Sequence, residues 1–307
     1  SHTGCRYYAS GASLRTASLG LFLDEKWEGD GLKIKEVIKR GPFAVKKTGV
    51  KPGDIIESID GVKILAGADY NALLDGKAGK PVRIGVKGKK EDIIVKPISS
   101  GELEELLYKR WVDRNRAFVD SISGGRIAYV HVKAMDSESF RKVYEELLSE
   151  SNRNRDAVVV DERHNGGGWL HDDLCTLLAG KEYQQFVPRD KYIGRDPYNK
   201  WTKPSCVLIC EDDYSNGHGF PWVYKELGIG KLIGTPVAGT MTAVWWERLM
   251  DSSLVFGIPQ VGCRDMRGVY GENTTLNPDI EVYNTPEDYI NGYDRQLERA
   301  VREMMKK

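Results

Sequence analysis

The sequence predicts an α/β domain with a mostly parallel sheet, preceded by a small β-rich domain. From about residue 99 onward, apolar strand-like runs alternate with helical runs, and this alternation is typical of parallel strands. Between residues 17 and 98, short apolar runs are separated by turns rich in glycine and proline. The expected organisation is therefore a segment 1–16, a β-rich domain 17–98 and an α/β domain 99–307.

The elements of the α/β domain follow from their hydrophobic periodicity. The expected strands are 127–132, 157–160 and 206–210, and the expected helices are 102–120, 137–148, 170–178, 221–227 and 294–305. The stretch 180–204 has little periodicity and many aromatic and basic residues, so we expect an irregular loop, serving either as a flap over a substrate or as an oligomer contact.

In the β-rich domain, residues 32–38 begin with the period-two alternation of a half-buried strand. A short apolar run, 19–23, precedes this strand, and residues 45–48 are compatible with a helix. The segment 49–61 contains two turns with a strand between them.

Two loops that follow apolar strands carry the candidate chemistry. Ser215 lies where the run 207–210 gives way to a polar turn and then to small residues that open a helix. The other loop, 161–168, reads Asp-Glu-Arg-His-Asn-Gly-Gly-Gly after the strand 157–160. A serine after a strand is most often a helix N-cap, but sites in α/β sheets form beyond the carboxyl ends of strands. The glycine-rich partner loop therefore favours one site built from both.

These two segments, in this order, resemble those of the tricorn and C-terminal processing group of serine peptidases. The first matches the pattern Asp-x-Arg-x-Asn-x-Gly-Gly, and the second matches the nucleophile segment. The resemblance continues in 232–235 and 277–282, so it covers nearly the whole chain. It implies a crotonase-like α/β catalytic domain and a peptidase that cleaves short peptides.

The general base separates the branches of this group. Processing peptidases use a lysine just past an Ile-Gly turn, whereas residues 235–240 contain no lysine and Lys231 precedes the turn. The chain opens with Ser1-His2, which resembles the tricorn branch and its Ser-Ser-His-Glu tetrad. That resemblance makes Ser215 the nucleophile, His2 the base, and Ser1 and Glu272 the supporting members.

The oxyanion donors expected from the same resemblance are backbone N–H groups. They belong to Asn216 and to Gly167 or Gly168, because glycine lets backbone approach a substrate closely. The family pattern usually has Asp directly after the nucleophile, where Asn216 stands here. A backbone donor is unaffected by that change, whereas a charge-based role would be lost.

A catalytic histidine at the second position needs support from preceding residues, so we expect this sequence to be part of a longer protein. The alternative is that Ser1-His2 is a tag remnant, and His218 is then the replacement base. Of the other histidines, His131 is expected to be structural. A three-histidine metal site from His164, His171 and His218 is a further alternative.

The segments 18–21 and 49–61 resemble a PDZ domain, with Ser18, Leu19, Gly20 and Leu21 as the carboxylate-binding loop. A PDZ domain adds a peptide as a strand to its own edge and holds the terminal carboxylate by backbone N–H groups. The alternative is an embedded domain whose groove is blocked by the rest of the protein.

The amino-acid composition limits the classes of partner that we expect for this chain. The chain has 45 Lys plus Arg and 45 Asp plus Glu, which gives no charge excess toward nucleic acid. No apolar run is long enough to span a bilayer. Of five cysteines, Cys206 and Cys210 lie four apart on one strand, about 13 Å, which excludes a disulfide between them and favours buried thiols. No cofactor and no metal are expected.

The remaining expectations rest on the resemblance. It implies oligopeptide substrates, a homo-oligomer that is a hexameric ring, and a cytoplasmic location, with a periplasmic or secreted one as the alternative. Trp245-Trp246 are expected in the core, or else along a substrate cleft. The alternative to a peptidase is a non-catalytic peptide-binding scaffold with a PDZ domain on a degenerate hydrolase domain.

Overall fold

The computed structural model describes residues 2–8 and 15–306 and divides the chain into two compact units. One unit comprises Ser10–Arg114, and the other comprises Ser1–Ala9 together with Asn115–Lys307. The change from one unit to the other along the sequence falls within helix α1 (Ser100–Ser123). Over the described residues, no helix is both long enough and apolar enough to cross a bilayer.

The smaller unit is an antiparallel β-sheet with strand order β2-β3-β4-β6-β7. Its strands are β2 (Leu21–Leu23), β3 (Leu32–Val37), β4 (Ile55–Ile59), β6 (Val82–Val86) and β7 (Ile93–Val95), and β5 (Val62–Lys63) pairs with β4. Two short 3₁₀ helices complete it, η1 (Lys46–Thr48) and η2 (Asn71–Leu74). Ile56, Ile59 and Ile84 are fully buried in its core. Ile56 and Ile59 both face inward, although they are three apart on β4, because a register irregularity falls between them.

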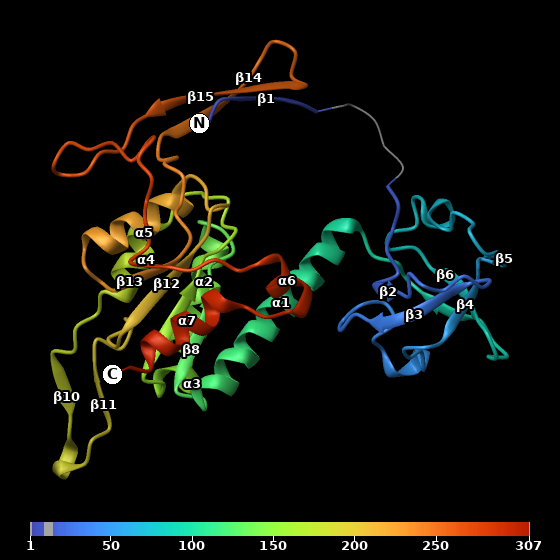
Figure 1. The fold of residues 1–307 in the computed structure, drawn as a ribbon, viewed down its shortest axis with the longest axis horizontal. Helices are drawn as coiled ribbons and strands as arrows, with labels where there is room; N and C mark the ends of the chain where they lie inside the picture. Colours follow the sequence, from blue (N-terminus) through green and yellow to red (C-terminus); the bar gives the residue numbers. More distant parts are fainter. Residues whose placement is uncertain (1, 9–14, 307) are drawn as a thin grey trace. The chain divides into compact units, whose positions relative to one another are not determined.

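The larger unit contains a five-stranded sheet in which every pair of strands is parallel. In the order of the sheet, the strands are β16 (Ile280–Glu281), β13 (Lys231–Gly234), β12 (Ser205–Ile209), β9 (Ala157–Asp161) and β8 (Ile127–His131) (Figure 1). Every residue of β8, β9 and β12 is buried, which explains why these strands read as continuous apolar runs rather than as alternating ones.

Helices cover both faces of this sheet. Besides the end of α1, the described helices of the larger unit are α2 (Ser137–Leu147), α3 (Glu150–Arg153), α4 (His171–Leu178), α5 (Asn216–Glu226), α6 (Pro286–Asn291) and α7 (Arg295–Met304). Val158 and Val160 of β9 share a core with residues of α2, α4 and α5, and α7 packs against β9, β12 and β13. Alternate residues of β9 therefore face two different layers of helices.

A second, antiparallel sheet brings the start of the chain to the same unit. Strand β1 (Gly4–Tyr7) pairs with β15 (Leu254–Val261), and β15 pairs with β14 (Ala243–Arg248). Figure 1 shows β1 lying along β15 although about 250 residues separate them in sequence. This pairing places His2, two residues before the first residue of β1, beside loops of the larger unit.

The predicted fold class is confirmed as an α/β domain with a parallel sheet plus a PDZ-like β-rich unit, and the predicted strands and helices are present with shifts of a few residues at their ends.

Three expectations were wrong. Helix α5 begins at Asn216 rather than at Pro221, which lies inside it. Residues 180–204 contain a hairpin of β10 (Gln184–Phe186) and β11 (Gly194–Asp196), with η3 (Pro188–Asp190) between the two strands. Trp245 and Trp246 are exposed on β14 rather than in the core.

Candidate active site

The loops that follow β9 and β12 meet because these strands are neighbours in a parallel sheet. The Asn165 N–H donates to Asp213 Oδ1 at 3.2 Å, and the Tyr214 N–H donates to the Asn165 carbonyl at 2.9 Å. The buried Asp213 carboxylate also accepts from the Cys210 N–H at 2.8 Å. The structure thus brings together the two segments that the sequence singled out.

Ser215 lies at the corner between β12 and α5 in a backbone conformation that a serine rarely adopts. Its φ is 58° and its ψ is −120°, at the N-cap of α5. A non-glycine residue in such a region costs about 1–3 kcal/mol and persists only where its surroundings impose it. The Ser215 N–H donates to Thr240 Oγ1 at 2.9 Å, which fixes this turn. The corner directs the hydroxyl into a cavity, as in the nucleophile elbows of hydrolases.

The two candidate glycines have no room for a side chain. A Cβ on Gly167 would lie 2.6 Å from Ser215 Cβ, and one on Gly168 would lie 2.2 Å from the Met135 carbonyl oxygen. The Gly167 N–H donates to Asn165 Oδ1 at 2.9 Å, so it is already engaged. Across the described residues, the Gly168 N–H has no acceptor, and Gly168 lines the cavity. Gly168 is therefore the better oxyanion donor of the two.

Both polar atoms of the Asn216 side chain form hydrogen bonds, whereas its backbone N–H forms none within the described residues. Its Oδ1 accepts the N–H groups of Leu170 at 2.7 Å and His171 at 3.1 Å. Its Nδ2 therefore donates to His171 Nδ1 at 2.9 Å, which requires that nitrogen to be unprotonated. Asn216 thus caps the start of α4, while its N–H, in the first turn of α5, has no acceptor in the described part of the chain.

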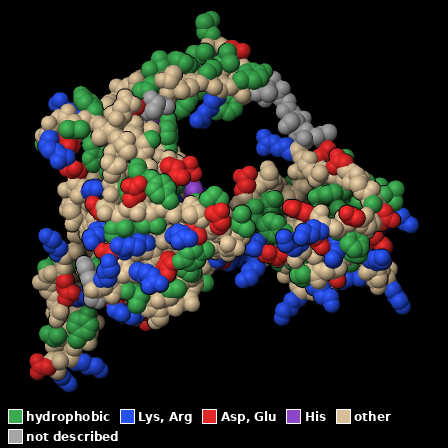
Figure 2. Space-filling model, viewed as in Figure 1, with side chains coloured by type: hydrophobic (Ala, Val, Ile, Leu, Met, Phe, Trp, Pro, Cys, Tyr) green, Lys and Arg blue, Asp and Glu red, His purple; other side chains and the backbone are tan. Residues whose placement is uncertain are grey.

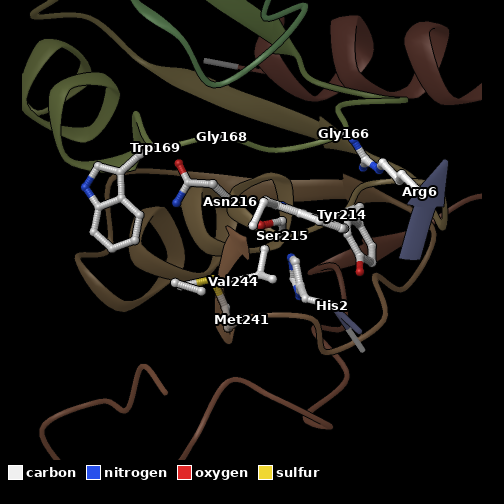
Figure 3. Close-up of a pocket in the computed structure, with 12 residues that line it drawn as sticks. His2, Arg6, Gly166, Gly168, Trp169, Tyr214, Ser215, Asn216, Met241 and Val244 are labelled. Atoms are coloured by element: carbon white, nitrogen blue, oxygen red, sulfur yellow. The ribbon is translucent and has the colours of Figure 1, made fainter. Parts of the chain in front are cut away.

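His2 lines the same cavity and is only 6% exposed. Its ring packs against Tyr214 with 4.6 Å between ring centroids, and Figure 3 shows the imidazole directed toward Ser215. Burial lowers the pKa of His2 below its usual 6.5, and the negative charge of Glu272 opposes that shift. A neutral imidazole beside a serine hydroxyl is the arrangement that general-base catalysis needs.

Glu272 is held near both His2 and His218. Its Oε2 accepts the Thr242 N–H at 3.0 Å, and its charge raises the pKa of each histidine. Ser1, the other expected supporting residue, lies outside the described residues.

The rival histidines occupy other positions. His218 is buried against Trp222 at 5.2 Å and does not line the cavity, and burial lowers its pKa to about 4. His131 is also buried, and its Nε2 contacts the Arg163 carbonyl at 3.3 Å, which is the structural role expected of it. Within the described ranges, the alternative trio of His164, His171 and His218 does not gather: His171 contacts Asn216, and His164 Nδ1 lies 2.9 Å from Asp212.

The cavity measures about 350 Å³, within the range of small-molecule sites (Figure 3). Sequence reasoning missed part of its lining, namely Arg6, Tyr214, Met241 and Val244. The Arg6 guanidinium lies 4.2 Å from the centre of the Trp246 ring, so Trp246 belongs to the cleft, the alternative expected for it. No sequence signal marks Arg6, because its place follows from pairing between β1 and β15. A second cavity of about 750 Å³ shares Trp169 and Met241 with the first and extends over α5.

Comparisons with known proteins show the family of this chain. The model of peptidase family S41 matches residues 126–282, and the PDZ domain model matches residues 33–88. The chain is 30% identical over 258 residues to the tricorn protease of Thermoplasma acidophilum, which covers 82% of this chain and 24% of that protein. It is also 30% identical over 304 residues to tricorn protease homolog 1 of Streptomyces coelicolor, covering 96% of this chain and 28% of that protein.

A crystal structure of the tricorn protease is similar with a TM-score of 0.82 at 26% identity, covering 94% of this chain and 29% of that chain. The chain therefore spans about a quarter of the length of the curated relatives that it matches.

The electrostatic link between Glu272 and His2 predicts a measurable titration shift. Glu272→Gln removes the negative charge that favours the imidazolium, so the pKa of His2 should fall further below 6.5. NMR titration of the His2 ring measures it, with Asp251→Asn on an exposed turn as the control. An unchanged His2 pKa in Glu272→Gln would show that the two groups are not coupled.

Proposed function

Because the chain belongs to peptidase family S41, we propose that it is a serine peptidase of the tricorn type that hydrolyses short peptides. The observation that carries this proposal is the convergence at one cavity of Ser215, His2 and the N–H groups of Gly168 and Asn216. Each proposed role belongs to a group that an acyl-transfer site requires: a nucleophile, a base and oxyanion donors.

In the proposed mechanism, Ser215 Oγ attacks the carbonyl carbon of the scissile peptide bond while His2 accepts the hydroxyl proton. The N–H groups of Gly168 and Asn216 donate to the oxyanion that forms, a contribution that is typically about 3–4 kcal/mol per donor. His2 then gives its proton to the leaving amine as the C–N bond breaks. Water, deprotonated by His2, hydrolyses the acyl-enzyme and restores Ser215.

The choice of His2 over a lysine base is supported by what surrounds Ser215. Among the described residues that line the cavity there is no lysine, and Lys231 is paired with Glu303 at 2.7 Å. Tyr214 holds the His2 ring by stacking, and Glu272 favours its protonated form. We propose that Glu272 acts through Ser1, as the tetrad of the tricorn branch implies.

The scaffold alternative explains less of this geometry. A degenerate hydrolase domain has no need of a strained Ser215, which a conformationally free residue would replace at lower cost. It also has no need of an unengaged N–H on each side of the serine. The crotonase-like relationship of the α/β unit remains part of the proposal, supported by its parallel sheet with helices on both faces.

The nucleophile assignment predicts covalent labelling. A fluorophosphonate probe should modify Ser215, and Ser215→Ala should abolish the labelling, because among the serines of residues 2–8 and 15–306 only Ser215 has a positive φ. Intact mass and peptide mapping locate the adduct. Ser151→Ala, an exposed serine on α3, is the matched control and should label normally. Undiminished labelling of Ser215→Ala would refute the assignment.

The base assignment predicts an asymmetry between two histidines. His2→Ala should lower kcat by about three to six orders of magnitude, as the loss of a triad histidine does. His218→Gln should change kcat only several-fold, because His218, in the first turn of α5, is buried and does not line the cavity. Peptide cleavage assays compare the two variants. Near-normal turnover in His2→Ala combined with loss in His218→Gln would contradict the tricorn-type assignment.

We propose that the smaller unit captures peptide ends. Strand β2 is an edge strand, and a cavity of about 140 Å³ lies beside it, lined by Ser18, Leu19, Leu21 and residues of η2. Gly20 has a φ of 66° and turns the backbone of this loop. Fluorescence polarisation should therefore detect binding of a peptide with a free terminal carboxylate and not of its amidated form. Equal binding of both would exclude carboxylate capture by residues 18–21.

The resemblance also implies a homo-oligomer, and we propose a hexamer. Exposed apolar side chains gather over β14, β15 and β1, where Figure 2 shows a green band. They include Tyr7, Trp245, Leu249, Met250, Ile258 and Val261. Contiguous apolar surface of this kind is typical of an interface. The cytoplasmic location remains a prediction.

Enclosure in a ring predicts selection by substrate size. The assembled protein should cleave oligopeptides and spare folded proteins, because only short or unfolded chains would reach the cavity. Light scattering measures the assembly, and paired assays on a short peptide and on a stable folded protein measure the selectivity. A monomer that degrades folded substrates as fast as peptides would contradict both parts.

A further inference from the structure

Three side chains beside the candidate active site bring one nitrogen, one sulfur and one oxygen ligand together. They are His164, in the loop after β9, and Cys210 and Asp212, in the loop after β12. Their ligand atoms all lie within 4.8 Å of one another. His164 Nδ1 is 2.9 Å from Asp212 Oδ2 and 3.8 Å from Cys210 Sγ. We propose that this trio is a binding site for a divalent transition-metal ion, with zinc as the best match.

The distances are close to those of a coordinated ion. Zinc binds nitrogen, sulfur and oxygen at about 2.0–2.3 Å in a tetrahedral arrangement, which separates ligand atoms by about 3.3–3.6 Å. The observed separations bracket this range, so side-chain adjustments of well under 1 Å for the measured pairs suffice. His164 and Asp212 are exposed and Cys210 is buried, so the ion would reach the site from solvent.

The chemistry of the ligands selects the ion. A thiolate and an imidazole favour zinc and similar borderline ions over magnesium or calcium, which prefer oxygen ligands. With the thiol deprotonated and the aspartate ionised, the site carries two negative charges and balances a divalent cation. On binding, the thiol proton is released to solvent. The open side of the site leaves the fourth position for water.

Backbone contacts hold the ligands in place. The backbone N–H of His164 donates to Cys210 Sγ at 3.2 Å, which holds the sulfur close to the His164 side chain. His164 has a φ of 67°, a left-handed conformation that few side chains adopt. An exposed His-Asp pair usually contributes little to the stability of a protein. The buried sulfur at the same point is what distinguishes this trio.

A metal ion here would join the two loops that also carry Gly168 and Ser215. The site is therefore placed to stabilise the arrangement of the proposed catalytic groups without contacting a substrate. Metal binding does not depend on the proposed peptidase activity, and it should be unchanged in Ser215→Ala.

Titration with Co²⁺ tests the site, because a thiolate ligand gives a charge-transfer absorption band that nitrogen and oxygen ligands do not. The reduced 307-residue chain should show a saturable band at one ion per chain, and Zn²⁺ should displace it. Cys210→Ser should abolish the band, whereas Cys5→Ser and Cys263→Ser should keep it.

The exposed ligands provide tests that do not risk the buried core. His164→Asn keeps the left-handed conformation accessible. His164→Asn and Asp212→Asn, as single variants, should each weaken Zn²⁺ binding by at least about tenfold, as measured by calorimetry. Four results would each overturn the proposal. They are absence of the band in the parent chain, survival of the band in Cys210→Ser, loss of the band in Cys5→Ser instead, and unchanged Zn²⁺ affinity in His164→Asn and Asp212→Asn.

Discussion

The contact between Asn165 and the buried Asp213 carboxylate is the interaction on which the rest of the site depends. Asp213 accepts N–H groups from both loops, and Asn165 accepts the Tyr214 N–H in return. The Asn165 side chain also donates to the Val132 carbonyl at 2.8 Å and accepts the Gly167 N–H. The backbone and side chain of this one residue thus fix the glycine loop, the turn before Ser215 and the residue that follows β8. Loss of the bond from Asn165 Nδ2 to the Val132 carbonyl would leave a buried polar group without a partner, which typically costs about 1–3 kcal/mol.

The strained Ser215 corner is stable because its neighbours cannot relax. Gly167 leaves no space beside Ser215 Cβ, and Thr240 holds the Ser215 N–H. Below the glycine loop, buried Arg163 pairs with Asp161 at 2.7 Å and with Asp294 of the α7 N-cap at 2.9 Å. Burial alone would raise the pKa of Asp161, and Arg163 more than offsets it, so the carboxylate stays ionised. The Asp-x-Arg segment therefore anchors the loop to the sheet and to α7.

Local sequence patterns predicted the elements well and the assembled site only in part. The buried strands β8, β9 and β12 were evident because continuous apolar runs between helices are typical of parallel sheets. The two loops were predicted to meet for the same reason. Arg6, Trp246 and the place of His2 depend on the pairing of β1 with β15, which no local pattern encodes. The hairpin β10-β11 was missed because its strands are only three residues long, are mostly polar and contain no buried residue.

We propose that the backbone N–H groups of Gly168 and Asn216 form one oxyanion hole around Ser215. A crystal structure of the chain with an organophosphonate bound covalently to Ser215 tests it most directly. The phosphoryl oxygen should lie about 2.7–3.1 Å from both nitrogens, the distance that an oxyanion donor requires, with His2 within reach of Ser215 Oγ. A phosphoryl oxygen directed away from both the glycine loop and Asn216 would contradict the proposed oxyanion hole.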